Sequence, residues 1–76
     1  MNIDEPKPGV LYSIEWYIDG DNIAGYGIGK YELIRNFHGD ILYLDFTSDG
    51  DIVTYRIDIQ YITSVKEYTH DMISNL

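Results

Sequence analysis

Three short stretches contain residue types that could bind a ligand or a metal ion, and the first of them could be a phosphate site. Gly25-Tyr26-Gly27-Ile28-Gly29-Lys30 offers main-chain N–H groups and a lysine, the groups with which glycine-rich loops hold phosphates. Its spacing matches neither GxGxxG nor GxxxxGK, and 76 residues are too few for a βαβ nucleotide domain. We therefore interpret this stretch as a bent strand.

Two acidic stretches, Asp19-Gly20-Asp21-Asn22 and Asp49-Gly50-Asp51, resemble fragments of calcium loops. An EF-hand loop spreads its ligands over about twelve residues, ends in glutamate and lies between helices. Neither stretch has these features, so both are interpreted as turns. We expect no metal and no other cofactor.

Catalysis would need a nucleophile or an acid beside a base at a recognisable spacing. The two histidines, His38 and His70, each lie close to an aspartate, but one falls in a predicted turn and the other in the tail. No serine has a base at such a spacing. The sequence therefore predicts that the protein is not an enzyme.

The best-defined element is the segment Ile41–Ile59, which predicts two strands joined at Asp49-Gly50. An Asp-Gly pair tolerates the positive φ angles of a tight two-residue turn. Side chains on either side of the turn alternate with the period of two that a half-buried strand requires. The residues expected to face inward are Leu42, Leu44, Phe46, Val53, Tyr55, Ile57 and Ile59.

The remaining elements follow from the same alternation and from turn residues. Val10–Ile18 is predicted to be a strand with Trp16 as its central buried plug. A second strand runs from Ile23 to Phe37; its three glycines share one face, where a ring or a crossing strand can approach, and a bulge is expected at Leu33-Ile34. Gln60-Tyr61 predicts a 3₁₀ turn and Ile62–Tyr68 a last strand. Thr69 could cap one helical turn that presents Met72, Ile73 and Leu76.

This order of elements predicts an all-β fold, a small five-stranded barrel over residues 10–68. It resembles SH3-like and Sm-like small barrels in element order, without a family signature. Residues 1–9 are expected to form a flexible arm, and residues 69–76 a tail or short helix. A five-stranded OB-type barrel and an antiparallel sheet with one terminal helix are alternative folds.

Composition limits the partners of the chain. Thirteen acidic and five basic residues give a formal charge of −8, which disfavours nucleic-acid backbones and anionic lipid. No cysteine is present, and no stretch approaches the roughly 20 apolar residues of a membrane span or the pattern of a signal peptide. We expect a cytoplasmic protein, in the host cytoplasm if a phage encodes it.

The predicted strands leave aromatic and acidic side chains on the outside, which is typical of a protein-binding face. The alternative is that some of them pack under the arm or the tail. The residues expected to contact a partner are Glu15, Tyr17, Asp19, Tyr26, Tyr43, Asp45, Arg56 and Asp58, with Ile41 and Ile52 nearby.

The leading hypothesis is a small acidic module that binds a protein with a basic surface, an inhibitor or adaptor of the phage type. In one version its carboxylates imitate a nucleic-acid backbone, and the partner is a DNA- or RNA-handling protein. A structural, self-assembling homo-oligomer is the first alternative. A nucleic-acid-binding Sm-like barrel is the second.

Overall fold

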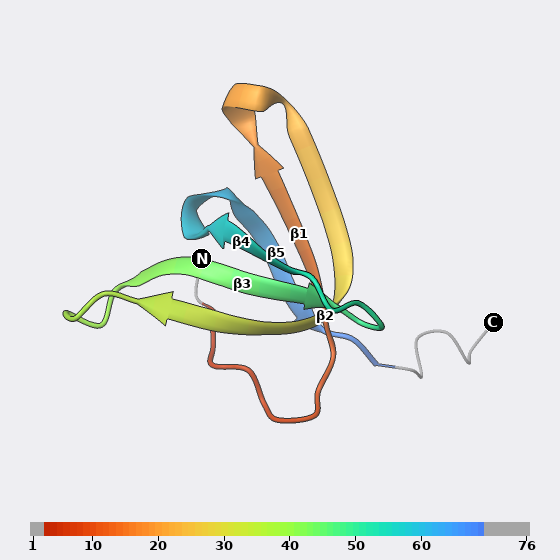
Figure 1. The fold of residues 1–76 in the computed structure, drawn as a ribbon. Helices are drawn as coiled ribbons and strands as arrows, with labels where there is room; N and C mark the ends of the chain where they lie inside the picture. The colour runs from red at the N-terminus through yellow and green to blue at the C-terminus, as the bar shows by residue number, and fades with distance from the viewer. Residues whose placement is uncertain (1–2, 70–76) are drawn as a thin grey trace.

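The computed structural model describes residues 3–69, and within them the chain forms one antiparallel sheet of five strands (Figure 1). The strands are β1 (Tyr12–Ile18), β2 (Ile23–Arg35), β3 (Ile41–Ser48), β4 (Thr54–Asp58) and β5 (Ile62–Glu67), with 3₁₀ turns η1 (Asp19–Asp21) and η2 (Ile59–Tyr61). The sheet order is β4-β3-β2-β1-β5. The all-β prediction is confirmed. The sheet is not closed, because β4 and β5 form its two edges without pairing, so the predicted small barrel is not confirmed.

The long strand β2 joins the two halves of the sheet. It pairs with β1 from Ile23 to Gly29 and with β3 from Gly29 to Arg35, and it turns sharply between these parts (Figure 1). The ring of Trp16 lies where a side chain on Gly25 would be, and a Cβ on Gly27 would lie 2.7 Å from the Phe46 ring. The prediction that the glycines leave room for bulky rings is confirmed.

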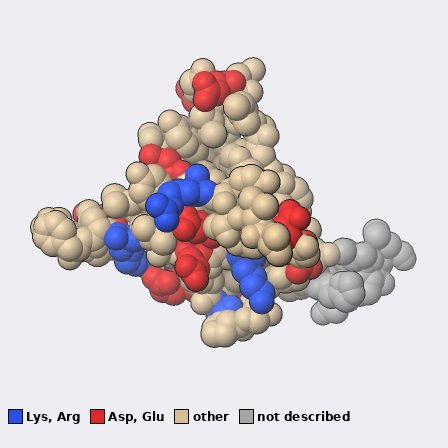
Figure 2. Space-filling view, viewed as in Figure 1, with Lys and Arg blue, Asp and Glu red and all other residues tan. Residues whose placement is uncertain are grey.

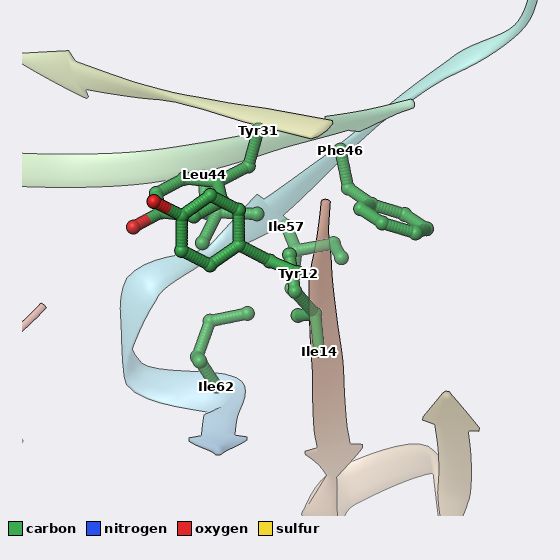
Figure 3. Close-up of a cluster of buried hydrophobic side chains, with 7 residues drawn as sticks. All are labelled: Tyr12, Ile14, Tyr31, Leu44, Phe46, Ile57 and Ile62. Atoms are coloured by element: carbon green, nitrogen blue, oxygen red, sulfur yellow. The ribbon is translucent and has the colours of Figure 1, made fainter. Parts of the chain in front are cut away.

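The core lies on the inner face of the curled sheet and takes side chains from every strand (Figure 3). Ile14, Leu44 and Phe46 are the largest fully buried side chains, as alternation predicted. The rings of Tyr12 and Tyr31 meet edge to face with their centroids 4.8 Å apart. The buried residues are Tyr12, Ile14, Tyr31, Leu44, Phe46, Ile57 and Ile62.

The segment before β1 lies against the core through both side chains and main chain. Ile3 and Val10 pack on the buried cluster. The Tyr31 hydroxyl donates to the Asp4 carbonyl oxygen at 2.6 Å, and the Lys7 main-chain N–H donates to the Tyr12 hydroxyl at 2.9 Å. The hydroxyls of these two buried tyrosines are therefore satisfied by the main chain of this segment.

The connection between β3 and β4 differs from the tight turn that was predicted. Asp51 N–H donates to the Ser48 carbonyl oxygen at 2.9 Å and Gly50 has φ 87°, so Asp49-Gly50 does form a turn. The last strand pair is Thr47 with Thr54, however, which leaves six residues in the connection instead of two. Ile52 and Val53 consequently lie outside the strand.

Several side chains predicted to be inside are exposed. Val53 and Tyr55 are each 51% exposed, because β4 is short and lies at an open edge of the sheet. Leu42, at the start of β3 and outside the buried cluster, is 40% exposed. Trp16 is half-buried, so Phe46 and not Trp16 fills the centre.

The smaller sequence predictions match within a residue or two. The β2–β3 register shifts between Ile34 and Arg35, one residue beyond the predicted bulge. The predicted 3₁₀ turn is found as η2, one residue longer, and the last strand ends at Glu67. The helical turn proposed after Thr69, with Met72, Ile73 and Leu76, lies outside the described residues.

Candidate functional site

The β1–β2 hairpin presents one group of the predicted contact residues on its outward face. Glu15 pairs with Tyr26 and Tyr17 pairs with Ala24, so these four side chains lie on the same side of the two strands. Tyr26 is 61% exposed and Tyr17 is 39% exposed. Tyr17 and Tyr26 are diagonal neighbours across the strand pair, a spacing of about 7–8 Å that two rings can bridge.

The tip of this hairpin is a short acidic turn. Asp19 and Asp21 belong to η1, and Asn22 closes it in the left-handed conformation with φ 53°, which asparagine tolerates better than most residues. The Tyr17 hydroxyl donates to the Asn22 side-chain oxygen, which orients the Tyr17 ring toward the tip. No basic residue lies in this turn.

The other predicted residues form a second group on the outward face of β3 and β4. Asp45 pairs with Arg56 and Tyr43 pairs with Asp58. The Arg56 guanidinium donates to both carboxylate oxygens of Asp45, at 2.9 and 3.1 Å, and lies 5.3 Å from the centre of the Tyr43 ring. Asp58 accepts a hydrogen bond from the Gln60 main-chain N–H at 3.1 Å and caps η2.

The charges of this second group are therefore used within the molecule. The hydrogen bond from Arg56 lowers the pKa of the Asp45 carboxyl below its ordinary value, and the same contact raises the pKa of Arg56. The Tyr43 ring is half-buried beside the guanidinium. A partner at this face would have to compete with contacts that already exist.

The eight predicted contact residues thus fall into two groups of four. One group belongs to the β1–β2 pair and the other to the β3–β4 pair, and the sharp turn of β2 separates the two faces (Figure 1). Within residues 3–69, no hydrogen bond, ion pair or aromatic contact joins a member of one group to a member of the other.

Alternation of side chains identifies only one of the two most exposed apolar residues of the described chain. Phe37, in the β2–β3 turn, is 93% exposed, and Ile52, in the β3–β4 connection, is 98% exposed. The Phe37 ring lies beside that of His38 with the centroids 4.0 Å apart. Ile52 was expected in water, whereas the exposure of Phe37, Val53 and Tyr55 was not predicted. Phe37 was expected at the end of the second strand, but β2 ends at Arg35 and Phe37 lies in the turn that follows.

A groove of about 740 Å³ runs between the Pro6–Val10 segment and the outward side of the sheet. Its floor includes the outward side chains of Lys30, Thr47 and Thr54. The hydroxyls of Thr47 and Thr54 lie 2.8 Å apart and satisfy each other. No side-chain polar atom in the described residues is buried without a hydrogen bond, so the groove contains no buried polar side chain that lacks a partner.

No set of three or more His, Cys, Asp or Glu side chains among residues 3–69 has a metal-binding arrangement. No helix in that range has the length and apolar character of a transmembrane span. His38 lies in an exposed turn, and His70 lies outside the described residues.

Comparison of the chain with known protein families, with curated proteins and with solved structures finds no match. The placement of exposed and paired side chains is therefore the basis on which a function can be inferred. By that criterion the outward face of the β1–β2 hairpin is the candidate site, since its aromatic and acidic groups have fewer contacts within the molecule than those of the second group.

Proposed function

We propose that this protein is a protein-binding module that docks a partner with a basic surface through the outward face of its β1–β2 hairpin. The observation that carries the proposal is the exposure of Tyr26, 61%, beside Glu15 and Tyr17 on a hairpin that projects from the sheet (Figure 1). Tyrosine is enriched at the centres of protein interfaces, because it offers a large ring and a hydroxyl at a small cost in side-chain entropy.

Electrostatics favours a cationic partner at this hairpin. Acidic side chains cap its tip, at the top of Figure 2, while Lys and Arg side chains lie lower on the molecule beside acidic ones. Lys7, Arg35 and Arg56 form ion pairs with Glu67, Glu5 and Asp45. The acids of the hairpin form no ion pair within residues 3–69, so their charge is available to attract and orient a partner.

We also propose that the sheet is an SH3-like barrel left open between β4 and β5. Three features support this finer description of the fold. β2 is shared between two strand pairs, the core draws on every strand, and η2 alone connects β4 to β5. In such an arrangement the β1–β2 hairpin projects from one end as a rigid element, which suits it to presenting side chains.

Site-specific photo-crosslinking tests the binding face without knowledge of the partner. A benzophenone analogue of phenylalanine is placed at position 26, irradiated in the native cell, and the crosslinked protein identified by mass spectrometry. The matched control carries the same analogue at position 37, which is also exposed but lies in the β2–β3 turn. We expect one basic protein to be crosslinked from position 26 and not from position 37.

The identified partner is then titrated with purified variants. Tyr26→Ala should weaken binding at least about tenfold, as truncation of an interface centre does. Asp19→Asn should lower mainly the association rate, and this effect should shrink as salt is raised. An acidic partner, equal crosslinking from both positions, or unchanged affinity of Tyr26→Ala would each refute the proposed face.

A further inference from the structure

The outer edge of β4 carries main-chain groups that no strand of the described chain uses. The phase of hydrogen bonding in the sheet identifies them. Asp49 N–H donates to the Ile28 carbonyl oxygen at 2.8 Å, in register with the β2–β3 ladder. In an antiparallel ladder every second pair is hydrogen-bonded. Glu32 with Asp45 lies four residues along each strand from Ile28 with Asp49, so it is also a hydrogen-bonded pair, and the main chain of Asp45 faces β2.

The same alternation continues into β4. Because the main chain of Asp45 faces β2, its partner Arg56 cannot be hydrogen-bonded to β3 and must face the outer edge. Thr54, two residues away, has the same orientation, and its hydroxyl lies 2.8 Å from that of Thr47, as expected where paired side chains approach closely. The N–H and C=O groups of Thr54, Arg56 and Asp58 therefore line the edge.

Apolar side chains flank this edge. Tyr55 and Val53 are each 51% exposed, and Ile52 is 98% exposed. No large hydrophobic side chain of β5, at the opposite edge, is exposed. Open edges in monomeric proteins are ordinarily shielded by several charged side chains or by a covering loop. The charged residues of β4 are one Arg and one Asp, whose charges cancel.

The distribution of charge indicates which molecule could bind at the β4 edge. The whole chain has a formal charge of −8, so most of its surface would repel a second copy. The segment 52–59 contains one Arg and one Asp and has no net charge. It is an edge with unpaired main-chain groups and exposed apolar side chains, and two copies can meet there without like-charge repulsion.

We propose that two copies of the chain pair antiparallel through β4 about a two-fold axis, with Tyr55 facing its counterpart on that axis. Two other registers would also place at least two edge residues of one copy opposite edge residues of the other. One would place Arg56 against Arg56 of the second copy, which is unfavourable. The other would run the ladder into η2, where the extended backbone ends at Asp58. The register centred on Tyr55 pairs the edge groups of Thr54 with those of Arg56 in the second copy and places Val53 opposite Ile57, so that Tyr55 and Val53 are covered.

Disulfide trapping tests this register, because the natural chain has no cysteine. Facing residues of a pair that is not hydrogen-bonded have Cα atoms about 4.5 Å apart, within the range that a disulfide spans. The Tyr55→Cys variant is oxidised at increasing concentration, beside Tyr26→Cys and Thr63→Cys as exposed controls on β2 and β5. We expect rapid formation of a covalent dimer from Tyr55→Cys only.

The unmodified protein provides a second measurement. Sedimentation velocity should show a concentration-dependent dimer of twice the 8.8 kDa chain mass. Tyr55→Lys should abolish the dimer and Tyr26→Lys should leave it unchanged. Both positions are exposed within one chain, so neither substitution should unfold the protein. A strict monomer at high concentration, or crosslinking of Tyr26→Cys or Thr63→Cys as fast as Tyr55→Cys, would overturn the proposal. Neither result bears on partner crosslinking at position 26.

Discussion

Replacing Gly29 with alanine should destabilise the fold severely, because the added methyl group meets main-chain atoms. A Cβ at this position would overlap the Thr47 carbonyl oxygen and lie 2.8 Å from the Ser48 Cα. Gly29 is also the residue at which β2 passes from β1 to β3. A flexible side chain could rotate away, but here β3 itself would have to move, which breaks ladder hydrogen bonds.

The expected loss follows from these contacts. Overpacking a well-filled site costs about 1–3 kcal/mol, and a lost main-chain hydrogen bond costs about 1 kcal/mol. We therefore expect Gly29→Ala to lose about 2–4 kcal/mol. A domain of this length has a total stability of about 4–11 kcal/mol. The melting temperature should fall by roughly 10–30 °C.

Urea unfolding followed by fluorescence measures this loss, because Trp16 is the one tryptophan and its ring lies 5.9 Å from that of Phe46. Gly20→Ala is the matched control, since a Cβ there meets nothing within 4 Å and the position lies in exposed η1. The control should change stability by less than about 0.5 kcal/mol. Equal midpoints for Gly29→Ala and Gly20→Ala would show that β3 does not approach β2 as described.

Three further predictions test burial and electrostatics. Leu44→Ala should cost about 2–5 kcal/mol in urea unfolding and Leu42→Ala less than about 1 kcal/mol, because Leu44 is fully buried and Leu42 is 40% exposed; equal losses would contradict this core. NMR titration should place the Asp45 pKa below its ordinary value, and this pKa should rise in the Arg56→Ala variant. The stabilisation that Asp45 provides should be present above its unfolded-state pKa and should disappear as the pH falls through its folded-state pKa. Burial raises the pKa of Tyr31 to about 12, so the midpoint of its ultraviolet titration should lie above the ordinary value of about 10. The stability that Tyr31 contributes should be lost as the pH rises from about 10 toward 12. A titration midpoint near 10 would mean that the Tyr31 ring is accessible to solvent.

The period-two pattern predicted much of the core correctly, because alternate side chains of a strand must face opposite sides. Ile14, Leu44, Phe46 and Ile57 were expected inside and are buried. The glycines of β2 were expected to admit bulky rings, and Trp16 and Phe46 occupy that space. These features depend only on neighbours along the chain and on side-chain size.

The same pattern was wrong where burial depends on what lies beyond the strand. Tyr55 points to the inner face but remains half-exposed, because β4 has a neighbour on one side only. Leu42 has the right parity but lies outside the buried cluster. Alternation states which side of a strand a residue faces, and it contains no information about whether another element covers that side.

The predicted contact residues show the same difference between what alternation predicts and what depends on tertiary contacts. The sequence placed Tyr17, Tyr26, Tyr43 and Asp45 outside, and none of them is in the buried core. It could not show that Arg56 would neutralise Asp45 and lie against Tyr43, since that contact depends on the β3–β4 register.

The sequence by itself determined the class of the fold, the direction of most strand side chains and the excess of negative charge, because each of these is a property of residue types and their spacing. Only the tertiary structure decided that the sheet stays open between β4 and β5, that the predicted contact residues divide into two faces, and that the charges of one face are already paired. The physical reason is that these properties depend on how strands pair and on which strands stay unpaired, which the local pattern of residues does not encode.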